Sequence, residues 1–555
     1  MPQAGTAQGA SAEVDPMDDG FNNWTLEDLI GQRFIVGFTG TEPTEGIAGL
    51  IQHFRIGGII LFSRNIRDAG QLHTLTSELQ AIAREAGARL PLLIATDQEN
   101  GVVRRMGRDT TNFPGAMALG ASGDPAIVQA VAQASGEELR ALGVTLNLAP
   151  VADLNTNPAN PVIGARSFGS NPQEVGRLVA AAVRGYRVAG VGATLKHFPG
   201  HGDTATDSHL ALPTLPFTLE RLRAVELLPF TSGIAAGADA VMLAHIALPQ
   251  ITPETPTLPA TLARRIAREL LRDELGFNGV VITDCLEMGA IAGTVGVARG
   301  AILAMQAGVD LILISHRADR QVAGIEAALA AARQGALDPV ELRASVERII
   351  RLKQRLARGV DEPEKPLAAA LAVVGSAAHR QVSADAYARS TTLLRDDDGL
   401  LPLRLAPQQR LLALACPPNL LLQASDTPYR HLALVAALQR RHADVTSHIL
   451  MRPSAAEGDQ ALVEALIAAD VVLLALLNAH LDAPQAQALH AVMRLAQRLG
   501  RPVVGVLAGD SYDLPLFPEL RTALATYEYS QIALEAAADV LFGVRSASGR
   551  LPVSL

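Results

Sequence analysis

The chain has 555 residues, of which 49% are hydrophobic and 19% are charged, and its formal net charge is -9. This length exceeds what one hydrophobic core usually supports, so we expect more than one domain. The acidic balance argues against a protein that grips the phosphate backbone of nucleic acids, because such a protein needs a basic face.

The amino-terminal residues 1–22 are expected to form a disordered leader, because they lack an apolar pattern. They also lack the basic start and the apolar core of a signal peptide. No apolar run in the sequence reaches the roughly 20 residues that a membrane span needs. The two cysteines, Cys285 and Cys416, are too few for a disulfide framework. Together these features predict a cytoplasmic protein without membrane contact.

Ordered structure is predicted to begin at about residue 24, where Thr25 and Asp28 fit a helix-capping box. From there, short apolar runs typical of strands buried on both faces alternate with helical segments such as 72–86 and 262–275. The predicted strands are 33–38, 56–62, 90–97, 145–153, 193–198, 240–246, 279–284 and 311–314. This alternation predicts a (β/α)8 TIM-type barrel over residues 23–358, with an open doubly wound sheet as the alternative.

Polar residues of the types used in catalysis lie at or just after the carboxyl ends of six predicted strands. They are Asp97, Asp153, Lys196 with His197, His245, Asp284 and His316. A barrel gathers its strand ends around one pocket, whereas an open sheet spreads them along a line. This distribution therefore favours the barrel.

A second domain is predicted after the barrel. The segment GVDEPEKP (359–366) is charged and contains two prolines, so residues 359–370 are predicted to form a linker. Beyond it, apolar runs at 411–416, 445–450, 470–477 and 501–509 alternate with helical stretches. This pattern predicts a smaller α/β sandwich domain over 371–555. No glycine-rich phosphate fingerprint follows these runs, so the sequence carries no signal for a nucleotide cofactor.

The segment 196–209 reads KHFPGHGDTATDSH and combines three histidines with two aspartates. One interpretation is a zinc hydrolase with ligands from His197, His201, Asp203 and His209. Their spacing lacks the compact pattern of di-zinc loops, so we expect no metal. The other interpretation is proton transfer, because Asp207 lies two residues before His209 and a carboxylate beside an imidazole fixes its tautomer and raises its basicity. A histidine that only caps a backbone carbonyl is the structural alternative.

Asp284 ends the apolar run GVVITD and is followed by CLEMGAI. A carboxylate that emerges from a buried strand into a pocket is a candidate nucleophile. An aspartate in this position also suits the N-cap of a following helix. The residues alone leave both interpretations open.

Several long motifs point to one family. They are KHFPGHGDTATDSH, DQENGVVRRM (97–106), NPVIGARSFG (160–169), VMLAHIALP (241–249) and ITDCLEMGAI (282–291). With them the chain resembles glycoside hydrolase family 3, and within it the β-N-acetylglucosaminidase branch. The closing segments YDLPLFPEL (512–520) and SGRLPVSL (548–555) extend the resemblance over almost the whole chain.

The resemblance implies a retaining mechanism at the mouth of the barrel. It makes Asp284 the nucleophile that forms a covalent glycosyl-enzyme, and His209 the acid/base held by Asp207. An imidazole with an ordinary pKa of about 6.5 can donate a proton to the leaving oxygen and later deprotonate water. Glucosidases of the family take a glutamate from the second domain instead, so this histidine favours an N-acetylhexosamine substrate.

The resemblance also implies a polar cage around the terminal sugar, built from Asp97, Arg105, Arg166, Lys196 and His197. Ion pairs at the barrel rim are the alternative role for these residues. Three segments depart from the usual pattern of the family. Asn100 and Val102 stand in DQENGVV where many members read DQEGGRV, Cys285 follows the nucleophile where Asp or Ala is usual, and GDSYD (509–513) replaces GNPYD.

Aromatic residues make up only 4% of the chain, with a single tryptophan, Trp24. A long polysaccharide cleft relies on aromatic platforms, so a small pocket that acts on chain ends fits better. We therefore predict a cytoplasmic, exo-acting β-N-acetylglucosaminidase for small carbohydrate substrates, namely cell-wall (muropeptide) or chitin-type fragments, without a cofactor. The open alternatives are phosphorolysis at the same site, another β-glycosidase of the family, a zinc hydrolase and an inactive sugar-binding protein.

Overall fold

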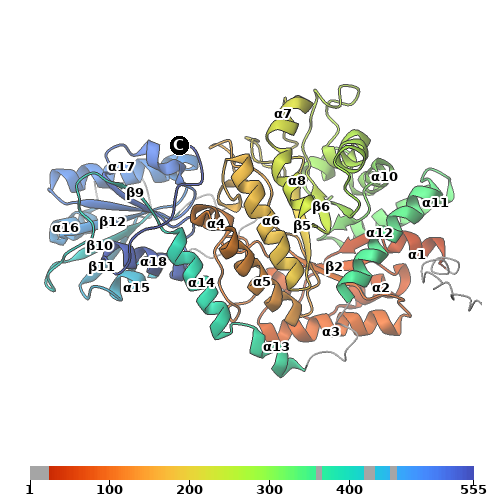
Figure 1. The fold of residues 1–555 in the computed structure, drawn as a ribbon, viewed down its shortest axis with the longest axis horizontal. Coiled ribbons are helices and arrows are strands. Elements are labelled where there is room, and N and C mark those ends of the chain that lie inside the picture. Colours follow the sequence, from red (N-terminus) through yellow and green to blue (C-terminus); the bar gives the residue numbers. More distant parts are fainter. Residues whose placement is uncertain (1–23, 358–365, 418–431, 451–458) are drawn as a thin grey trace, which may run out of the picture.

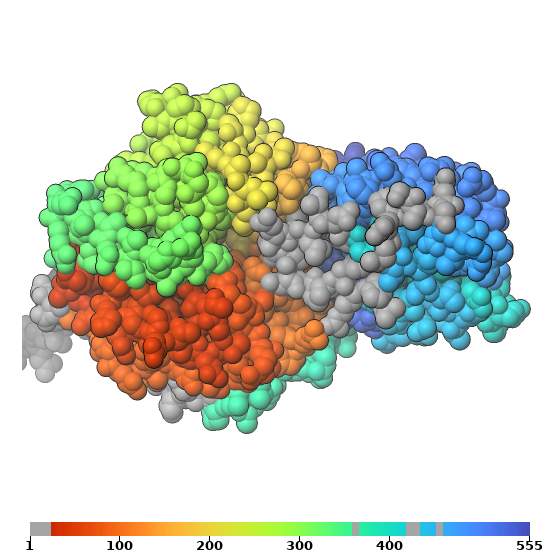
Figure 2. Space-filling view, turned by 180° about the vertical axis from the view of Figure 1, so that it is seen from behind, coloured from red at the N-terminus to blue at the C-terminus, as the bar shows by residue number. Residues whose placement is uncertain are grey.

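The computed structural model describes residues 24–357, 366–417, 432–450 and 459–555. The predicted leader (1–22) and residues 359–365 of the predicted linker lie outside these ranges. Figure 1 shows two bodies side by side, a larger one coloured red to green and a smaller one in blue. From the opposite side, Figure 2 shows the same two lobes as space-filling surfaces.

The larger body is an eight-stranded parallel barrel with strand order β7-β6-β5-β4-β3-β2-β1-β8. The barrel is nearly closed, because β7 and β8 meet through a single bridge between Ile282 and Leu311. The predicted barrel is confirmed. Its strands are β1 (Phe34–Val36), β2 (Gly58–Leu61), β3 (Leu93–Thr96), β4 (Leu146–Asn147), β5 (Gly192–Phe198), β6 (Ala240–Leu243), β7 (Val280–Thr283) and β8 (Ile312–Ile314).

Most strand residues are apolar, because both faces of each strand are covered. One face, with Ile35, Ile60 and Leu93, fills the interior of the barrel. The other face, with Phe34 and Ile59, packs under the surrounding helices. The fourth strand is much shorter than the predicted 145–153. Pro150 lies within that range, and it has no backbone N–H to donate to a neighbouring strand.

Helices surround the barrel, and several begin at side-chain caps. The capping box predicted at Thr25 and Asp28 is confirmed. A π-helix, Arg265–Glu274, lies between β6 and β7. The α-helices are α1 (Leu26–Gly31), α2 (Glu45–Phe54), α3 (Ala69–Glu85), α4 (Ala116–Ser122), α5 (Pro125–Ala141), α6 (Pro172–Val188), α7 (Leu219–Ala224), α8 (Leu227–Ala235), α9 (Gly289–Ala292), α10 (Val297–Ala307), α11 (Ala318–Arg333) and α12 (Pro339–Ala357).

The smaller body contains a six-stranded sheet with order β11-β10-β12-β13-β14-β9, in which only the edge strand β9 is antiparallel. Four of its strands match the predicted runs. The other two, β9 and β14, were not predicted. The strands are β9 (Thr392–Asp396), β10 (Leu411–Ala415), β11 (Val445–Ile449), β12 (Val471–Leu476), β13 (Val503–Leu507) and β14 (Thr522–Ala525).

Helices cover both faces of this sheet, so the smaller body is the predicted α/β sandwich. Helices α15 (Leu432–Gln439) and α18 (Gln531–Leu541) pack on one face. Helices α16 (Gln460–Ala468) and α17 (Ala483–Arg498) pack on the other. Two further helices, α13 (Leu367–Val373) and α14 (Ala377–Ser390), run along the barrel toward the sandwich (Figure 1). Residues 367–370 of the predicted linker are therefore helical.

The two bodies share a packed interface. Met117 and Ala118 of α4 belong to the same hydrophobic cluster as strands and helices of the sandwich. Buried hydrogen bonds join them as well, because Glu528 accepts the backbone N–H of Gly115 at 3.1 Å and the Tyr512 hydroxyl donates to Asn155 O at 3.0 Å. Within the described residues, no helix combines the length and apolarity required to cross a membrane.

Candidate active site

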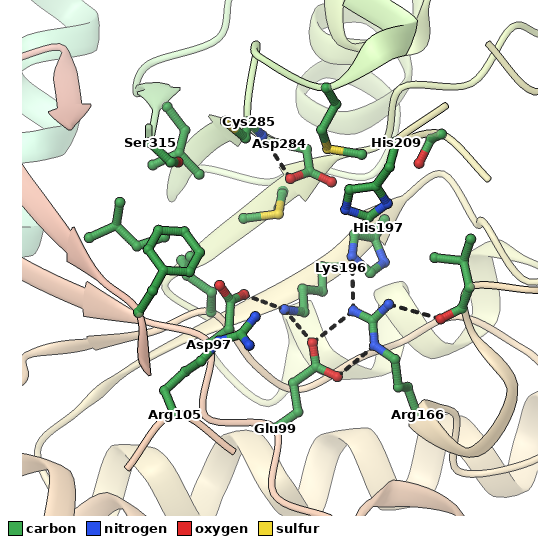
Figure 3. A pocket seen from close by; sticks show the side chains of 18 of the residues that line it. Asp97, Glu99, Arg105, Arg166, Lys196, His197, His209, Asp284, Cys285 and Ser315 are labelled. Atoms are coloured by element: carbon green, nitrogen blue, oxygen red, sulfur yellow. Dashed lines mark hydrogen bonds and ion pairs between the residues drawn. The ribbon is translucent and has the colours of Figure 1, made fainter. Parts of the chain in front are cut away.

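A cavity of about 440 Å³ opens at the carboxyl ends of the barrel strands. Seven of the eight predicted site residues line it: Asp97, Arg105, Arg166, Lys196, His197, His209 and Asp284. The eighth, Asp207, contacts His209 from behind. Figure 3 shows these side chains converging on one space from several strands. This is where a TIM-type barrel places its catalytic groups.

One wall of the cavity is a network of buried charges. Lys196, which is 2% exposed, lies on β5 and binds Asp97 at 2.7 Å and Glu99 at 2.6 Å. Arg166, in the turn Gly164–Arg166, contacts both carboxylate oxygens of Glu99 at 2.8 Å. Burial alone would raise the pKa of Glu99, but the charges of Arg166 and Lys196 lower it strongly, so this carboxylate remains ionised.

Glu99 was not among the predicted site residues, although it is the third residue of the DQE motif. Its partners Arg166 and Lys196 are both in the predicted set. These ion pairs hold the polar groups of the three side chains in fixed positions at the cavity wall. The DQE motif could have pointed to Glu99 as a site residue. Nothing in the local sequence, however, indicates that Glu99 pairs with two cations from two distant segments.

His197 is oriented by Asp153, which lies after β4. The His197 ring contacts Asp153 through Nδ1 at 2.6 Å, and the same carboxylate accepts the backbone N–H groups of His197 and His201. Burial opposes ionisation of Asp153, but the interaction with His197 and the hydrogen bonds that the carboxylate accepts lower its pKa. With Nδ1 held by Asp153, the other ring nitrogen of His197, Nε2, lies at a distance of 3.5 Å from Arg166. Both residues line the cavity.

The proposed acid/base pair lies on the loop after β5. Nδ1 of His209 contacts Asp207 Oδ1 at 2.7 Å, and the backbone N–H of His209 donates to the same oxygen. Burial works against the imidazolium, but the hydrogen bond that His209 makes to Asp207 and the charge of Asp284 raise the pKa of His209. Its Nε2 is thus the atom available for proton exchange with a ligand in the cavity.

Local contacts hold this loop in place. The buried His201 ring bridges Thr204 Oγ1 and Ser208 Oγ, each at 2.9 Å. Gly202 packs so closely on the segment after β4 that an added Cβ would lie 1.5 Å from Leu154 O. The backbone N–H of Gly289 donates to His209 O, which ties the loop to the segment after β7.

Asp284 follows β7, and its carboxylate points toward His209 within the cavity (Figure 3). Its Oδ1 accepts the backbone N–H of Cys285 at 2.7 Å. Burial would raise the pKa of Asp284, but His245, His197 and His209 together lower it, so the carboxylate is ready to act as a nucleophile. His245 is itself held between Thr261 Oγ1 and Cys285 O.

The histidines of segment 196–209 do not form a common ligand set. His197 contacts Asp153, His201 contacts Thr204 and Ser208, and His209 contacts Asp207. Each imidazole thus has its own partner. This arrangement suits hydrogen-bonded positioning better than the zinc hydrolase interpretation.

The remaining wall comes from the segments after β2, β3, β7 and β8. Arg64 lies over the Phe62 ring at 4.3 Å from its centroid, and Arg105 lies 5.6 Å from the same centroid. Cys285 and His316 complete this side. All the described residues that line the cavity belong to the barrel, and the GDSYD segment of the sandwich contributes none of them.

Comparisons with known proteins show the family to which the chain belongs. A family model, the glycosyl hydrolase family 3 N-terminal domain, matches residues 25–352. β-Hexosaminidase A of Pseudoalteromonas piscicida is 34% identical over 93% of this chain and 92% of its own. The chain belongs to glycoside hydrolase family 3. It is accordingly a glycosidase, as the sequence predicted.

Solved structures of the family share the two-domain fold. A family 3 β-N-acetylglucosaminidase from Paenibacillus sp. str. FPU-7 is 39% identical, with a TM-score of 0.88 over 96% of this chain and 99% of that one. A fungal multi-domain family 3 β-N-acetylglucosaminidase is 40% identical with the same TM-score, and the present chain spans 61% of its length.

Proposed function

We propose that this glycosidase is a retaining, exo-acting β-N-acetylglucosaminidase. The observation that carries the proposal is that the Asp207–His209 pair faces Asp284 in one cavity. The buried charged side chains of Lys196 and Arg166 line the same cavity. The relatives named β-hexosaminidase and β-N-acetylglucosaminidase support the same substrate class.

The proposed reaction has two steps. In the first, the Asp284 carboxylate attacks the anomeric carbon, the glycosidic bond breaks, and His209 Nε2–H gives its proton to the leaving oxygen. In the second, His209 removes a proton from water, the resulting hydroxide attacks the anomeric carbon, and the Asp284 ester is released. Asp97, Arg105, Arg166, Lys196 and His197 hold the terminal sugar.

A groove supports the proposal that the substrate is a cell-wall fragment. It has a volume of about 780 Å³ and shares Ser63 and Arg105 with the cavity. Four arginines and two aspartates line it: Arg67, Arg104, Arg105, Arg108, Asp68 and Asp109. Muropeptides carry carboxylates and chitin fragments do not, so this excess of positive charge favours muropeptide-type aglycones. The enzyme would then act in peptidoglycan recycling.

We also propose a cytoplasmic location. Both Cys285 and Cys416 are free thiols, which suits a reducing compartment. Cell fractionation with an antibody to the protein tests this: recovery in the extracellular medium or periplasm would contradict it.

The decisive experiment compares an aryl N-acetyl-β-glucosaminide with the matching aryl β-glucoside, using the purified protein in EDTA. We expect release from the acetamido sugar only, with the β-anomer as first product in NMR. Equal release from both sugars would indicate another β-glycosidase of the family. Binding of N-acetylglucosamine without release would indicate an inactive sugar-binding protein.

Phosphorolysis is a second candidate because the acid/base is an imidazole, which does not repel a phosphate dianion as a carboxylate would. Arg105 and Arg166 add positive charge to the cavity. Product analysis in phosphate buffer separates the two reactions: N-acetylglucosamine 1-phosphate would establish phosphorolysis, and free N-acetylglucosamine alone would exclude it.

A further inference from the structure

A second group of side chains with metal-ligand chemistry adjoins the nucleophile. Cys285 and Glu287 follow β7, and His316 follows β8. Their ligand atoms, Sγ, a carboxylate oxygen and a ring nitrogen, all lie within 4.8 Å of one another. This group is distinct from the histidines of segment 196–209, and no step of the proposed hydrolysis uses it.

The group is already organised by contacts. The Cys285 thiol donates to Glu287 Oε2 at 3.9 Å. The Glu287 side chain is 4% exposed and accepts the backbone N–H groups of His316 and Arg317, at 2.5 and 3.1 Å. The His316 ring packs against Phe62 with centroids 5.5 Å apart. The carboxylate therefore holds the loop that presents the imidazole.

The chemistry of the three side chains selects a particular class of ion. Thiolate, imidazole and carboxylate together suit zinc and its close relatives, whereas calcium and magnesium require oxygen ligands. Three protein ligands leave the fourth tetrahedral position open. Cys285 and His316 both line the cavity, so that position would be accessible from the space where a substrate binds.

We propose that Cys285, Glu287 and His316 bind a zinc-class divalent cation, and that the bound ion inhibits the enzyme. The thiol gives up its proton, a sulfur–metal bond forms, and the proton passes to solvent. The backbone N–H of Cys285 donates to Asp284 Oδ1 at 2.7 Å. A metal ion bound to the Cys285 sulfur therefore disturbs this hydrogen bond and with it the position of the nucleophile. The ion would also occupy part of the cavity wall.

Nearby charges set the expected strength of the site. Arg320 lies 3.9 Å from Glu287, and Arg64 lies close enough to interact with both Cys285 and Glu287. These cations oppose a divalent ion, so we expect weaker binding than at a structural zinc site. Reversible occupancy is what an inhibitory site requires.

Cobalt(II) provides the test, because a thiolate bound to it gives a charge-transfer absorption in the near ultraviolet. We expect this absorption in the wild-type protein and in Cys416→Ala, which removes the other buried thiol. It should be absent from Cys285→Ala and from Cys285→Ser. In His316→Ala, the dissociation constant for cobalt should rise by about 10- to 100-fold or more.

A second measurement, the inhibition of hydrolysis by zinc, links the site to activity. This measurement rests on the proposed function. Zinc should inhibit hydrolysis by the wild type and by Cys416→Ala at the same concentration. Since Cys285 adjoins the nucleophile, its variants are compared with and without zinc rather than with the wild type. Zinc inhibition that persists in Cys285→Ser would place the ion elsewhere and overturn the inhibitory role.

Cobalt binding is read independently of turnover, so failure of the proposed function would not obscure the result. Wild-type protein that shows no thiolate absorption with excess cobalt would overturn the site. So would an absorption that persists in Cys285→Ser and disappears in Cys416→Ala.

Discussion

At the scale of single residues, two of the carboxylates that line the cavity have different tasks. Asp284 is proposed to react, whereas Glu99 neutralises the buried Lys196 and Arg166. Both have a lowered pKa, because nearby histidines at Asp284 and the Arg166 and Lys196 charges at Glu99 outweigh the effect of burial. Substitutions at the two positions should therefore have different consequences.

Replacing the nucleophile should abolish turnover without unfolding the protein. In Asp284→Asn we expect kcat to fall by about 1000-fold or more, because an amide cannot form the glycosyl ester, a loss of at least about 4 kcal/mol of transition-state stabilisation. Steady-state kinetics measures the loss, and unchanged circular dichroism shows that the fold persists. A variant with more than a tenth of wild-type kcat would contradict the assignment.

Removing the partner of the acid/base should change the pH profile. In Asp207→Asn we expect kcat/KM to fall by roughly 100-fold, within the range for general acid catalysis. The Asp207 hydrogen bond raises the pKa of His209, so its loss lowers that pKa. His209 acts first as an acid, and the alkaline limb of kcat/KM should therefore move to lower pH. A limb at the wild-type position would exclude His209 as that acid.

Removing the central carboxylate of the cage should cost stability. Glu99→Gln leaves Lys196 and Arg166 buried with less compensating charge, which typically costs about 3–5 kcal/mol. Because the folded-state pKa of Glu99 is lowered, its contribution is complete above its unfolded pKa of about 4.3 and fades below it. Urea unfolding should thus show a stability difference from wild type that shrinks on acidification. The exposed Glu78→Gln serves as the control and should show no such difference.

At the scale of elements, the loop between β5 and α7 depends on backbone packing as much as on its polar residues. Apart from the fourth strand, the sequence predicted the carboxyl ends of the barrel strands well, because apolar runs and the polar residues that end them are local signals. It did not predict β9, whose pattern is only partly buried because it lies at the edge of the sheet. Edge strands have weaker apolar patterns, so their signal in a sequence is weaker too.

A single methyl group should displace the catalytic loop. In Gly202→Ala the new Cβ would lie 1.5 Å from Leu154 O, a backbone atom that cannot swing aside. We expect kcat/KM to fall by about 100-fold, as a displacement of about 1 Å can cause, while the barrel remains folded. Gly49→Ala is the matched control, because its nearest neighbour is a side-chain atom at 3.9 Å within α2. Wild-type activity in Gly202→Ala would show that the loop tolerates movement.

At the scale of the whole molecule, the sandwich supports the barrel without lining the cavity among the described residues. Glu528 of the sandwich is buried at the interface, where it accepts from Gly115 N and from the Tyr387 hydroxyl. Burial raises the pKa of Glu528 above the ordinary value of a glutamate.

Two substitutions at this position should separate hydrogen bonding from charge. Glu528→Ala leaves buried donors without an acceptor, at a cost of about 1–3 kcal/mol for each donor. Glu528→Gln keeps an acceptor for Gly115 and an N–H for the tyrosine oxygen, so it should cost much less. Scanning calorimetry of both variants checks this. Equal destabilisation would mean that the charge of Glu528 matters after all.

The sequence determined the alternation that makes the barrel, the family, and the eight residues proposed to bind and cleave the sugar. Each of these is carried by neighbouring residues, through strand patterns or contiguous motifs. Only the tertiary structure joined Glu99 to Arg166, Asp153 to His197, and Cys285 to His316. Partners of this kind lie on or after different strands, between 31 and 67 residues apart. No local pattern encodes such a contact, because it exists only once the barrel closes and brings the strand ends together.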